Sequence, residues 1–303
     1  MPPTTPLRLG IDLGGTKIAG AVLDRDGATL ASYTVSTPQN DYPSTLAAIV
    51  GVVTKLESQT ALGLPVGVGI PGSLSPSTGL MQNANSTCLN GQPFDRDLHT
   101  LLGRPARFAN DANCFALSEA TDGAGTGART VFGVILGTGC GGGIVINGKI
   151  LDGPRGIGGE WGHNPLPWAT QDELAHPPCW CVRNGCIESW VSGPGIAADH
   201  AQVTGENLTP EAIAAAATTR DPHAQATLDR HANRLARSLA TVVNLIDPEV
   251  IVLGGGLSSL PHLYTSLPAL MAPYIFADNT QIIIRPPKHG PASGVRGAAW
   301  LWP

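Results

Sequence analysis

One strand-turn-strand pattern occurs twice in this chain, over Leu9–Asp24 and again over Val131–Gly148. Each copy consists of an apolar run, a Gly-Thr turn and a second apolar run. After the second apolar run comes a dipeptide that strongly predicts a hairpin turn, Asp26-Gly27 in the first copy and Asn147-Gly148 in the second. Turns without side chains let backbone N–H groups approach an anion closely, so two such turns can clamp a polyphosphate. The simplest interpretation is a duplicated half with a nucleotide between the halves.

The residues in and after these turns argue against two other nucleotide motifs. Gly137, Gly139 and Gly142 fit the spacing G-x-G-x-x-G, but that fingerprint needs a helix after the glycines to take the pyrophosphate. Residues 143–148 are rich in β-branched side chains and end in a turn, so they predict a strand. Neither turn has the spacing of a Walker A loop.

Composition predicts a globular protein of two domains. The chain has 303 residues, of which 42% are hydrophobic and 14% charged. A net charge of −5 argues against a nucleic-acid surface, which would need a basic patch. No apolar stretch is long enough to span a membrane, and Met1–Pro6 lacks a signal pattern, so we expect a cytoplasmic protein.

The first half of the chain predicts strands at 7–13, 17–23, 29–35 and 66–70, with a helix at 44–60 between the last two. A polar loop over 71–96 comes next, and a loop of that length is usually functional or disordered. Its amides at Asn83, Asn85 and Asn90 suit a sugar-like ligand, although Asn in loops is more often plain turn chemistry.

The second half restarts after a short strand at 106–109 and a helix over 112–120. It predicts strands at 130–136, 142–151 and 249–253, a helix at 228–246, and an irregular stretch at 153–186. The third of these strands runs into Gly254–Gly256. A last helix over 293–302 is expected to pack back on the first domain.

Three cysteines cluster as Cys179-x-Cys181-x4-Cys186, and we expect them to bind zinc. Dense cysteines in a reducing compartment are more often metal ligands than disulfides, although three unliganded thiols are the alternative. Three thiolates need one more ligand for tetrahedral zinc, and His163 and His176 are both candidates.

Four carboxylates stand where chemistry is expected. Asp111 lies where a strand hands over to a helix, so it is either an N-cap, a general base, or both. Asp12 ends the first strand, where it could hold magnesium through waters, and Lys17 beyond the turn is a phosphate contact or a surface charge. Glu160 and Glu188 flank the cysteine cluster and are either solvated or accept sugar hydroxyls.

Together these segments resemble the ROK family, whose members are similar to the actin and sugar-kinase ATPases. The segments that carry the resemblance span nearly the whole chain: Asp12-Leu-Gly-Gly-Thr-Lys17, Gly69-Ile-Pro-Gly72, Asn110-Asp-Ala-Asn113, Leu136-Gly-Thr-Gly139, Gly159-Glu-Trp-Gly-His163, Pro178-Cys-Trp-Cys181, Gly185-Cys-Ile-Glu188 and Leu253-Gly-Gly-Gly256. The resemblance implies an α/β, two-domain, actin-like (ribonuclease H-like) fold with an active-site cleft between domains. The expected domains are 1–120 and 121–289, with 290–303 packing back on the first.

The resemblance also implies the site residues. ATP and Mg²⁺ are expected on the two turns and a third glycine run, at Asp12, Gly14, Gly15, Thr16, Lys17, Gly137, Thr138, Gly139, Gly254, Gly255 and Gly256. Sugar contacts are expected at Asn85, Asn110, Asp111, Glu160, His163 and Glu188, with Asp111 as the base. The implied Zn²⁺ ligands are His163, Cys179, Cys181 and Cys186.

The chain departs from the family pattern in two places. Val182 stands where the family usually has Gly after the second cysteine. The gap from His163 to Cys179 is longer than in typical glucokinases of the family and encloses His176, so the fourth zinc ligand stays open.

Within the family, the segments 83–94 and 163–168 are most similar to bacterial fructokinases. We therefore expect phosphorylation of fructose at its 6-hydroxyl, by a homodimer. N-acetylglucosamine kinase, glucokinase and mannokinase are the alternatives. A sugar-sensing repressor is disfavoured, because the first strand begins near Leu7 and leaves no room before it for a DNA-binding module.

Overall fold

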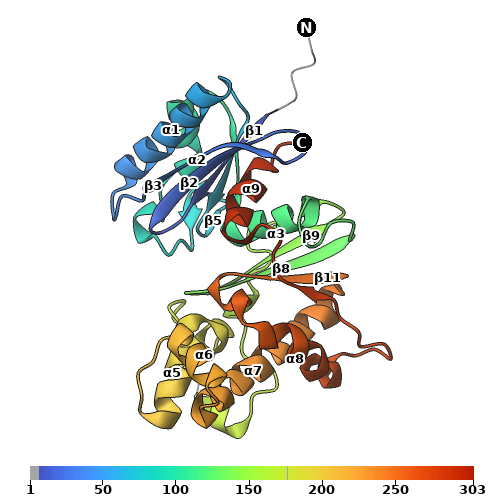
Figure 1. The fold of residues 1–303 in the computed structure, drawn as a ribbon. Coiled ribbons are helices and arrows are strands. Elements are labelled where there is room, and N and C mark those ends of the chain that lie inside the picture. Colours follow the sequence, from blue (N-terminus) through green and yellow to red (C-terminus); the bar gives the residue numbers. More distant parts are fainter. Residues whose placement is uncertain (1–6, 176) are drawn as a thin grey trace. The chain divides into compact units, whose positions relative to one another are not determined.

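The computed structural model describes residues 7–175 and 177–303, and these divide into two compact units (Figure 1). The first unit contains the chain up to Gly127 together with Gly143–Gly159 and Lys288–Pro303. The second contains Ala128–Gly142 and Glu160–Pro287. No helix in the described part of the chain is long and apolar enough to cross a membrane.

The first unit is built on a mixed sheet whose strands lie in the order β3-β2-β1-β4-β7. These strands are β1 (Arg8–Leu13), β2 (Lys17–Leu23), β3 (Thr29–Ser36), β4 (Val66–Ile70) and β7 (Ala106–Asn110). β1, β4 and β7 run parallel, whereas β2 is antiparallel to both of its neighbours. The carboxyl ends of the three parallel strands therefore share one edge of the sheet.

Glycines bring helices onto both faces of this sheet. A methyl group on Gly20 would meet Val52 and Leu56 of α1 (Tyr42–Gln59), whereas one on Gly10 would collide with the backbone of α9 (Ser293–Ala299). Gly20 pairs with the residue after Gly10, and successive side chains of a strand point to opposite faces. The last helix of the chain thus completes the core that the first strands begin.

The expected loop over 71–96 carries short ordered elements. They are β5 (Ser73–Leu74), β6 (Met81–Gln82), the 3-10 helix η1 (Thr87–Leu89) and the start of α2 (Phe94–Leu102). Asn90 secures the turn between them, because its side chain accepts from the N–H of Ala84 and donates to the carbonyl of Ala84, both at 2.9 Å. The Asn90 side chain therefore stabilises a turn, which was the alternative to a sugar contact.

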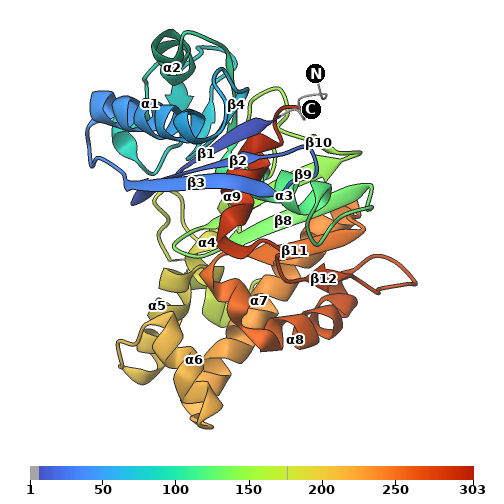
Figure 2. The same cartoon turned by 45° about the horizontal axis from the view of Figure 1, so that its top comes forward.

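A second sheet has the strand order β10-β9-β8-β11-β12 (Figure 2). Its strands are β8 (Thr130–Leu136), β9 (Cys140–Ile146), β10 (Lys149–Ile150), β11 (Val250–Gly254) and β12 (Ile284–Arg285). The single strand expected over 142–151 is two strands. Asn147 and Gly148 have φ of 50° and 73°, which is the geometry of a tight hairpin turn.

The other helices of the second unit are α4 (Glu188–Val191), α5 (Gly193–Thr204), α6 (Pro210–Thr218), α7 (Pro222–Ile246) and α8 (Pro261–Met271). α7 starts earlier than its apolar stripe predicted, because Asp221 caps it by accepting from the N–H groups of His223 and Ala224. Its buried Arg234 and Arg237 are ion-paired.

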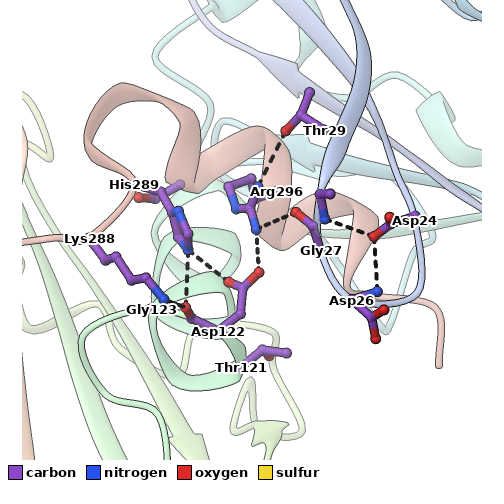
Figure 3. A network of polar contacts seen from close by, with 12 residues as sticks. Asp24, Asp26, Gly27, Thr29, Thr121, Asp122, Gly123, Lys288, His289 and Arg296 are labelled. Carbon is purple, nitrogen blue, oxygen red and sulfur yellow. Dashed lines mark hydrogen bonds and ion pairs between the residues drawn. The ribbon is translucent and has the colours of Figure 1, made fainter.

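A polar network holds the returning segment 288–296 to the end of α3 (Asp111–Thr121) (Figure 3). Asp122 pairs with Arg296 and accepts from His289 Nε2 at 2.9 Å, and its carbonyl accepts from Lys288 Nζ at 2.7 Å. Arg296 also donates to the carbonyl of Gly27 in the β2–β3 turn. Three distant stretches of sequence are tied together here.

Candidate functional site

In the first unit, the polar residues of the site collect at the carboxyl edge of the parallel strands. Asp12 on β1 lies in register with Gly69 on β4, and Gly69 in turn with Ala109 on β7. Asn110 ends β7, and Asp111 begins α3. Strand ends that converge at one edge are where α/β sheets collect ligands.

Asn110, and not Asp111, is the N-cap of α3. Its Oδ1 accepts from the N–H of Ala112 at 2.9 Å, and its Nδ2 donates to the carbonyl of Gly72 at 3.1 Å. Asp111 is the first helical residue and also accepts from the Ala112 N–H, through Oδ1, at 2.8 Å. The N-cap role that was one alternative for Asp111 therefore belongs to Asn110.

Burial raises the pKa of both acids at this edge. The pKa of Asp12 rises to about 6, first because of burial and then because of the neighbouring charge of Asp111, while Lys17 opposes the shift. Burial also raises the pKa of Asp111, against hydrogen bonds from Ala112 and Asn110 that lower it. A raised pKa in a carboxylate is a property that general bases share.

The first glycine turn is exposed to solvent, and two side chains donate hydrogen bonds to its carbonyl groups. Gly15, Thr16 and Lys17 are exposed. The carbonyl of Gly14 accepts from Thr37 Oγ1 at 2.7 Å, and that of Gly15 accepts from Gln39 Nε2 at 2.8 Å. The loop around Ser86 lies beside this turn, because a methyl group on Gly15 would lie 3.9 Å from Ser86 Oγ. Asn85, the preceding residue of that loop, is exposed.

In the second unit, a pocket of about 700 Å³ opens beside the second glycine turn. Gly137 and Thr138 line it, and Gly256 lines it from the end of β11. The remaining lining comes from α5, the start of α6 and the segment between them, at Gly193, Pro194, Ala197, Ala198, Ala201, Asn207, Leu208, Thr209, Pro210 and Glu211, and from Leu257. The lining is mostly apolar, and its polar side chains are those of Thr138, Asn207, Thr209 and Glu211.

The other expected nucleotide glycines have structural positions. Gly254 is a buried residue of β11, and a methyl group on Gly255 would collide with the backbone of Leu136. Gly255 has φ of 78°, so only its lack of a side chain allows the approach. A methyl group on Gly139 would lie 2.7 Å from Glu188 Oε2. Gly139, Gly254 and Gly255 do not line the pocket. They lie next to the residues that do, Gly137 and Thr138 in one segment and Gly256 in the other.

The four expected metal ligands come together. One ligand atom from each of His163, Cys179, Cys181 and Cys186 lies within 4.8 Å of the other three. The Cys181 and Cys186 sulfurs are 3.5 Å apart, and Cys179 Sγ is 3.6 Å from His163 Nδ1. Tetrahedral zinc with bonds of about 2.3 Å to sulfur separates its ligands by roughly 3.8 Å. His176 lies outside the described residues.

Glu188 connects this cluster to the second glycine turn. Its Oε2 accepts from the N–H of Cys140 at 2.8 Å, directly after the turn, and its Oε1 accepts from Trp180 Nε1 at 2.6 Å. The Trp180 ring stands edge-on to the ring of His163 at 5.0 Å. Glu160, partly buried, precedes a short 3-10 helix that ends at His163.

Sequence reasoning missed two parts of this arrangement. Trp180 lies between two cysteines and could have been noted as a donor near the cluster. The wall formed by α5 and the segment 207–211 carries a weaker signal, since its small and apolar residues resemble any packed helix. The sequence signal for the start of α5 is Ser192-Gly-Pro, a capping residue followed by Pro in the first turn of the helix.

Comparison with known proteins places this arrangement in a family. A profile of the ROK family matches residues 8–303. N-acetyl-D-glucosamine kinase from Photobacterium profundum is 38% identical over 296 residues, which cover 96% of this chain and 98% of that protein. N-acetyl-D-glucosamine kinase from Pasteurella multocida is 37% identical over 301 residues, covering 98% of this chain and 99% of that protein.

Solved structures agree. The ROK hexokinase from Thermus thermophilus superposes with a TM-score of 0.86 at 30% identity, over 97% of both chains. A ROK family glucokinase from Streptomyces griseus, solved with glucose and AMPPNP, gives 0.79 at 27% identity over 97% of this chain and 98% of that one. The expected α/β, actin-like fold class is confirmed. This chain is a member of the ROK family.

Proposed function

We propose that the protein is an ATP-dependent sugar kinase that phosphorylates N-acetyl-D-glucosamine at its 6-hydroxyl. The observation that carries the kinase assignment is the edge of the first sheet, where Asp111 stands partly buried at the start of α3 with a raised pKa. Such a carboxylate can accept the proton of a sugar hydroxyl. The oxygen then bonds to the γ-phosphorus of ATP, the bond from that phosphorus to the β–γ bridging oxygen breaks, and ADP leaves.

The nucleotide is proposed to bind in the pocket of the second unit. The second glycine turn, which lines it at Gly137 and Thr138, suits phosphates, because N–H groups in a glycine turn can point at an anion. The N–H of Gly137 itself donates to the carbonyl of Gly139 at 3.0 Å and so holds the turn. The apolar hollow lined by α5 suits the adenosine. Asp12 would hold Mg²⁺ through water, and the turn Gly14–Lys17, exposed from Gly15 on, would contribute further phosphate contacts.

Zinc is proposed as a structural ion at His163, Cys179, Cys181 and Cys186. A closed set of four protein ligands leaves no open position for chemistry. When bound, zinc would staple a loop that has little apolar core of its own. Because Nδ1 of His163 faces the cluster, its Nε2–H could donate to a sugar hydroxyl, and the carboxylates of Glu160 and Glu188 could accept hydrogen bonds from sugar hydroxyls. Asn85 and Asn110 are further proposed sugar contacts.

The proposed substrate corrects the expectation of fructose. Resemblance at two short segments favoured fructose, but relatives that are 36–38% identical over 96–98% of this chain are named N-acetyl-D-glucosamine kinases. That similarity extends over nearly the whole chain. Two short segments weigh less.

A coupled assay of ADP release over N-acetylglucosamine, glucose, mannose and fructose tests the substrate. N-acetylglucosamine should have the highest kcat/KM, by about tenfold or more over glucose, because a site built to bind an acetamido group leaves polar groups unpaired with an analogue that lacks it. Fructose as the best substrate would reverse the choice and keep the kinase. Turnover of none of the four would refute the kinase assignment. Metal analysis should find about one zinc per chain.

A further inference from the structure

The carboxylate of Asp12 rests against a glycine of the last helix. A methyl group on Gly294 of α9 would lie 2.9 Å from Oδ2 of Asp12, 3.2 Å from its Cγ and 3.5 Å from its Oδ1. These are the three nearest atoms, and all belong to Asp12. A contact under 3.0 Å forces a shift, so a side chain at 294 would press on this carboxylate before anything else.

The backbone of Gly294 cannot move away to relieve such a contact. The preceding residue, Ser293, is fully buried, and its hydroxyl donates to Glu119 Oε1 at 2.7 Å. On the following turn, a methyl group on Gly297 would collide with the carbonyl of Cys114 in α3, which shows that the two helices are packed backbone to backbone. With α9 fixed at both ends, the carboxylate is the part that must move.

We propose that Gly294 is a positioning residue for Asp12: α9 forms a wall that sets the orientation of the Asp12 carboxylate toward the hydrated magnesium ion of MgATP. This inference rests on the proposed function for the role of magnesium, but not for the contact itself. The absence of a side chain at position 294 lets the carboxylate lie flat against the helix.

Two further contacts favour this arrangement. Asp12 lies in register with Gly69 on the neighbouring strand, where a methyl group would stand 3.7 Å from Asp12 Oδ1 and 3.3 Å from Cys114 Sγ. The carboxylate therefore lies between two glycines of different elements. The raised pKa of Asp12, caused first by burial, is what a carboxylate walled in by backbone should have.

The first test substitutes Gly294→Ala. Because the carboxylate must turn away, the Mg²⁺ concentration for half-maximal rate should rise about tenfold and kcat should fall about tenfold, while KM for the sugar changes less than twofold. The matched control is Gly51→Ala in α1, where a methyl group meets nothing within 4 Å. That variant should leave all three constants unchanged. Wild-type values of kcat and of the magnesium requirement in Gly294→Ala would overturn the proposal.

The second test does not depend on catalysis. Melting temperatures are measured for the wild type, Asp12→Ala, Gly294→Ala and the double variant, without nucleotide. Gly294→Ala should lower the melting temperature of the wild type by about 2–4 °C and leave that of Asp12→Ala unchanged, since the alanine at 12 removes the atoms that the methyl group meets. Equal losses in both backgrounds would show that position 294 acts elsewhere. If no sugar is phosphorylated, this cycle still decides the contact.

Discussion

Two neighbouring carboxylates in the first unit have pKa values raised chiefly by burial, and they differ in the smaller contributions. Asp12 is raised by burial and by the charge of Asp111. Asp111 is raised by burial alone, against the hydrogen bonds that it accepts. In a pair of this kind, one acid can serve as a ligand for a cation that neutralises its charge, and the other is left to accept a proton.

Replacing Asp111 should separate catalysis from binding. Asp111→Asn should lower kcat by about a hundredfold to ten-thousandfold, the usual contribution of a general base, because an amide cannot accept the hydroxyl proton. Sugar affinity, measured by calorimetry without ATP, should stay within roughly tenfold. Turnover close to wild type in this variant would remove Asp111 from the mechanism.

The raised pKa of Asp12 predicts how stability depends on pH without metal. In the unfolded chain this acid has a pKa near 3.8, and in the folded protein about 6, so the folded state holds the proton more tightly. Its contribution to the free energy of unfolding is therefore largest below pH 4 and is lost as pH rises to 6, by up to about 3 kcal/mol.

Denaturant unfolding from pH 4 to pH 8 measures this, with Asp12→Asn as the control that cannot titrate. The difference in unfolding free energy between wild type and variant should change through this window and be constant above pH 7. A constant difference throughout would mean that the Asp12 pKa is not raised.

Among the elements, those set by local chemistry could be predicted from the sequence. The strands of the first sheet, the two glycine turns and the cysteine cluster all carry short-range signals, such as alternating apolar residues and ligand spacing. Asn147-Gly148 marks the hairpin in the sequence, but the strand expected over 142–151 runs through that dipeptide, because Ile150 and Leu151 continue the apolar pattern after the turn.

Elements fixed by distant contacts could not be predicted. The pocket wall of α5 depends on which helix face meets Gly137, and no local pattern encodes that. The contact of Gly294 with Asp12 joins opposite ends of the sequence. Sugar preference likewise depends on several segments at once, so two short resemblances are a weak basis for choosing the sugar.

The irregular stretch 153–186 is anchored by a buried ionic group as well as by the cysteine cluster. Glu173, 6% exposed, pairs with Arg234 at 2.8 Å and with Arg237 at 2.8 Å, and Arg237 also donates to the carbonyl of Pro167 at 2.9 Å. Arg234 further pairs with Asp199 on α5. The loop is thus tied to α7 independently of metal.

Glu173→Gln should therefore destabilise the second unit without releasing zinc. Removing one partner of a buried pair leaves the arginines uncompensated, at a cost of about 3 kcal/mol. Denaturant unfolding gives the stability, and metal analysis should still find the wild-type zinc content. Asp172→Asn, at the exposed neighbouring position, is the control and should change stability by less than about 0.5 kcal/mol. Equal effects of both substitutions would contradict an anchoring role.

At the scale of the whole molecule, the first unit is assembled from three separate stretches of chain, including the last sixteen residues, Lys288–Pro303. Its sheet is covered on one face by α9, and the chain end is held by Trp302, whose Nε1 donates to the carbonyl of Val66 at 2.7 Å. This unit is therefore complete only with the C-terminal segment in place, and its stability depends on the contacts that hold that segment.

The network of Figure 3 is the polar part of that attachment, and Asp122→Asn tests it. The substitution removes the charge that pairs with Arg296, which is buried, and with His289, so the unfolding free energy should fall by about 2 kcal/mol and the melting temperature by roughly 4–8 °C. Asp26→Asn is the matched control, because Asp26 is exposed in the adjacent turn and its side chain can lose its charge at little cost.

Since the C-terminal segment also carries Gly294, the Asp122 variant should require more Mg²⁺ for half-maximal rate when assayed near its melting temperature, whereas the Asp26 variant should not. A variant at 122 that melts like wild type would show that apolar packing of α9 alone closes the unit.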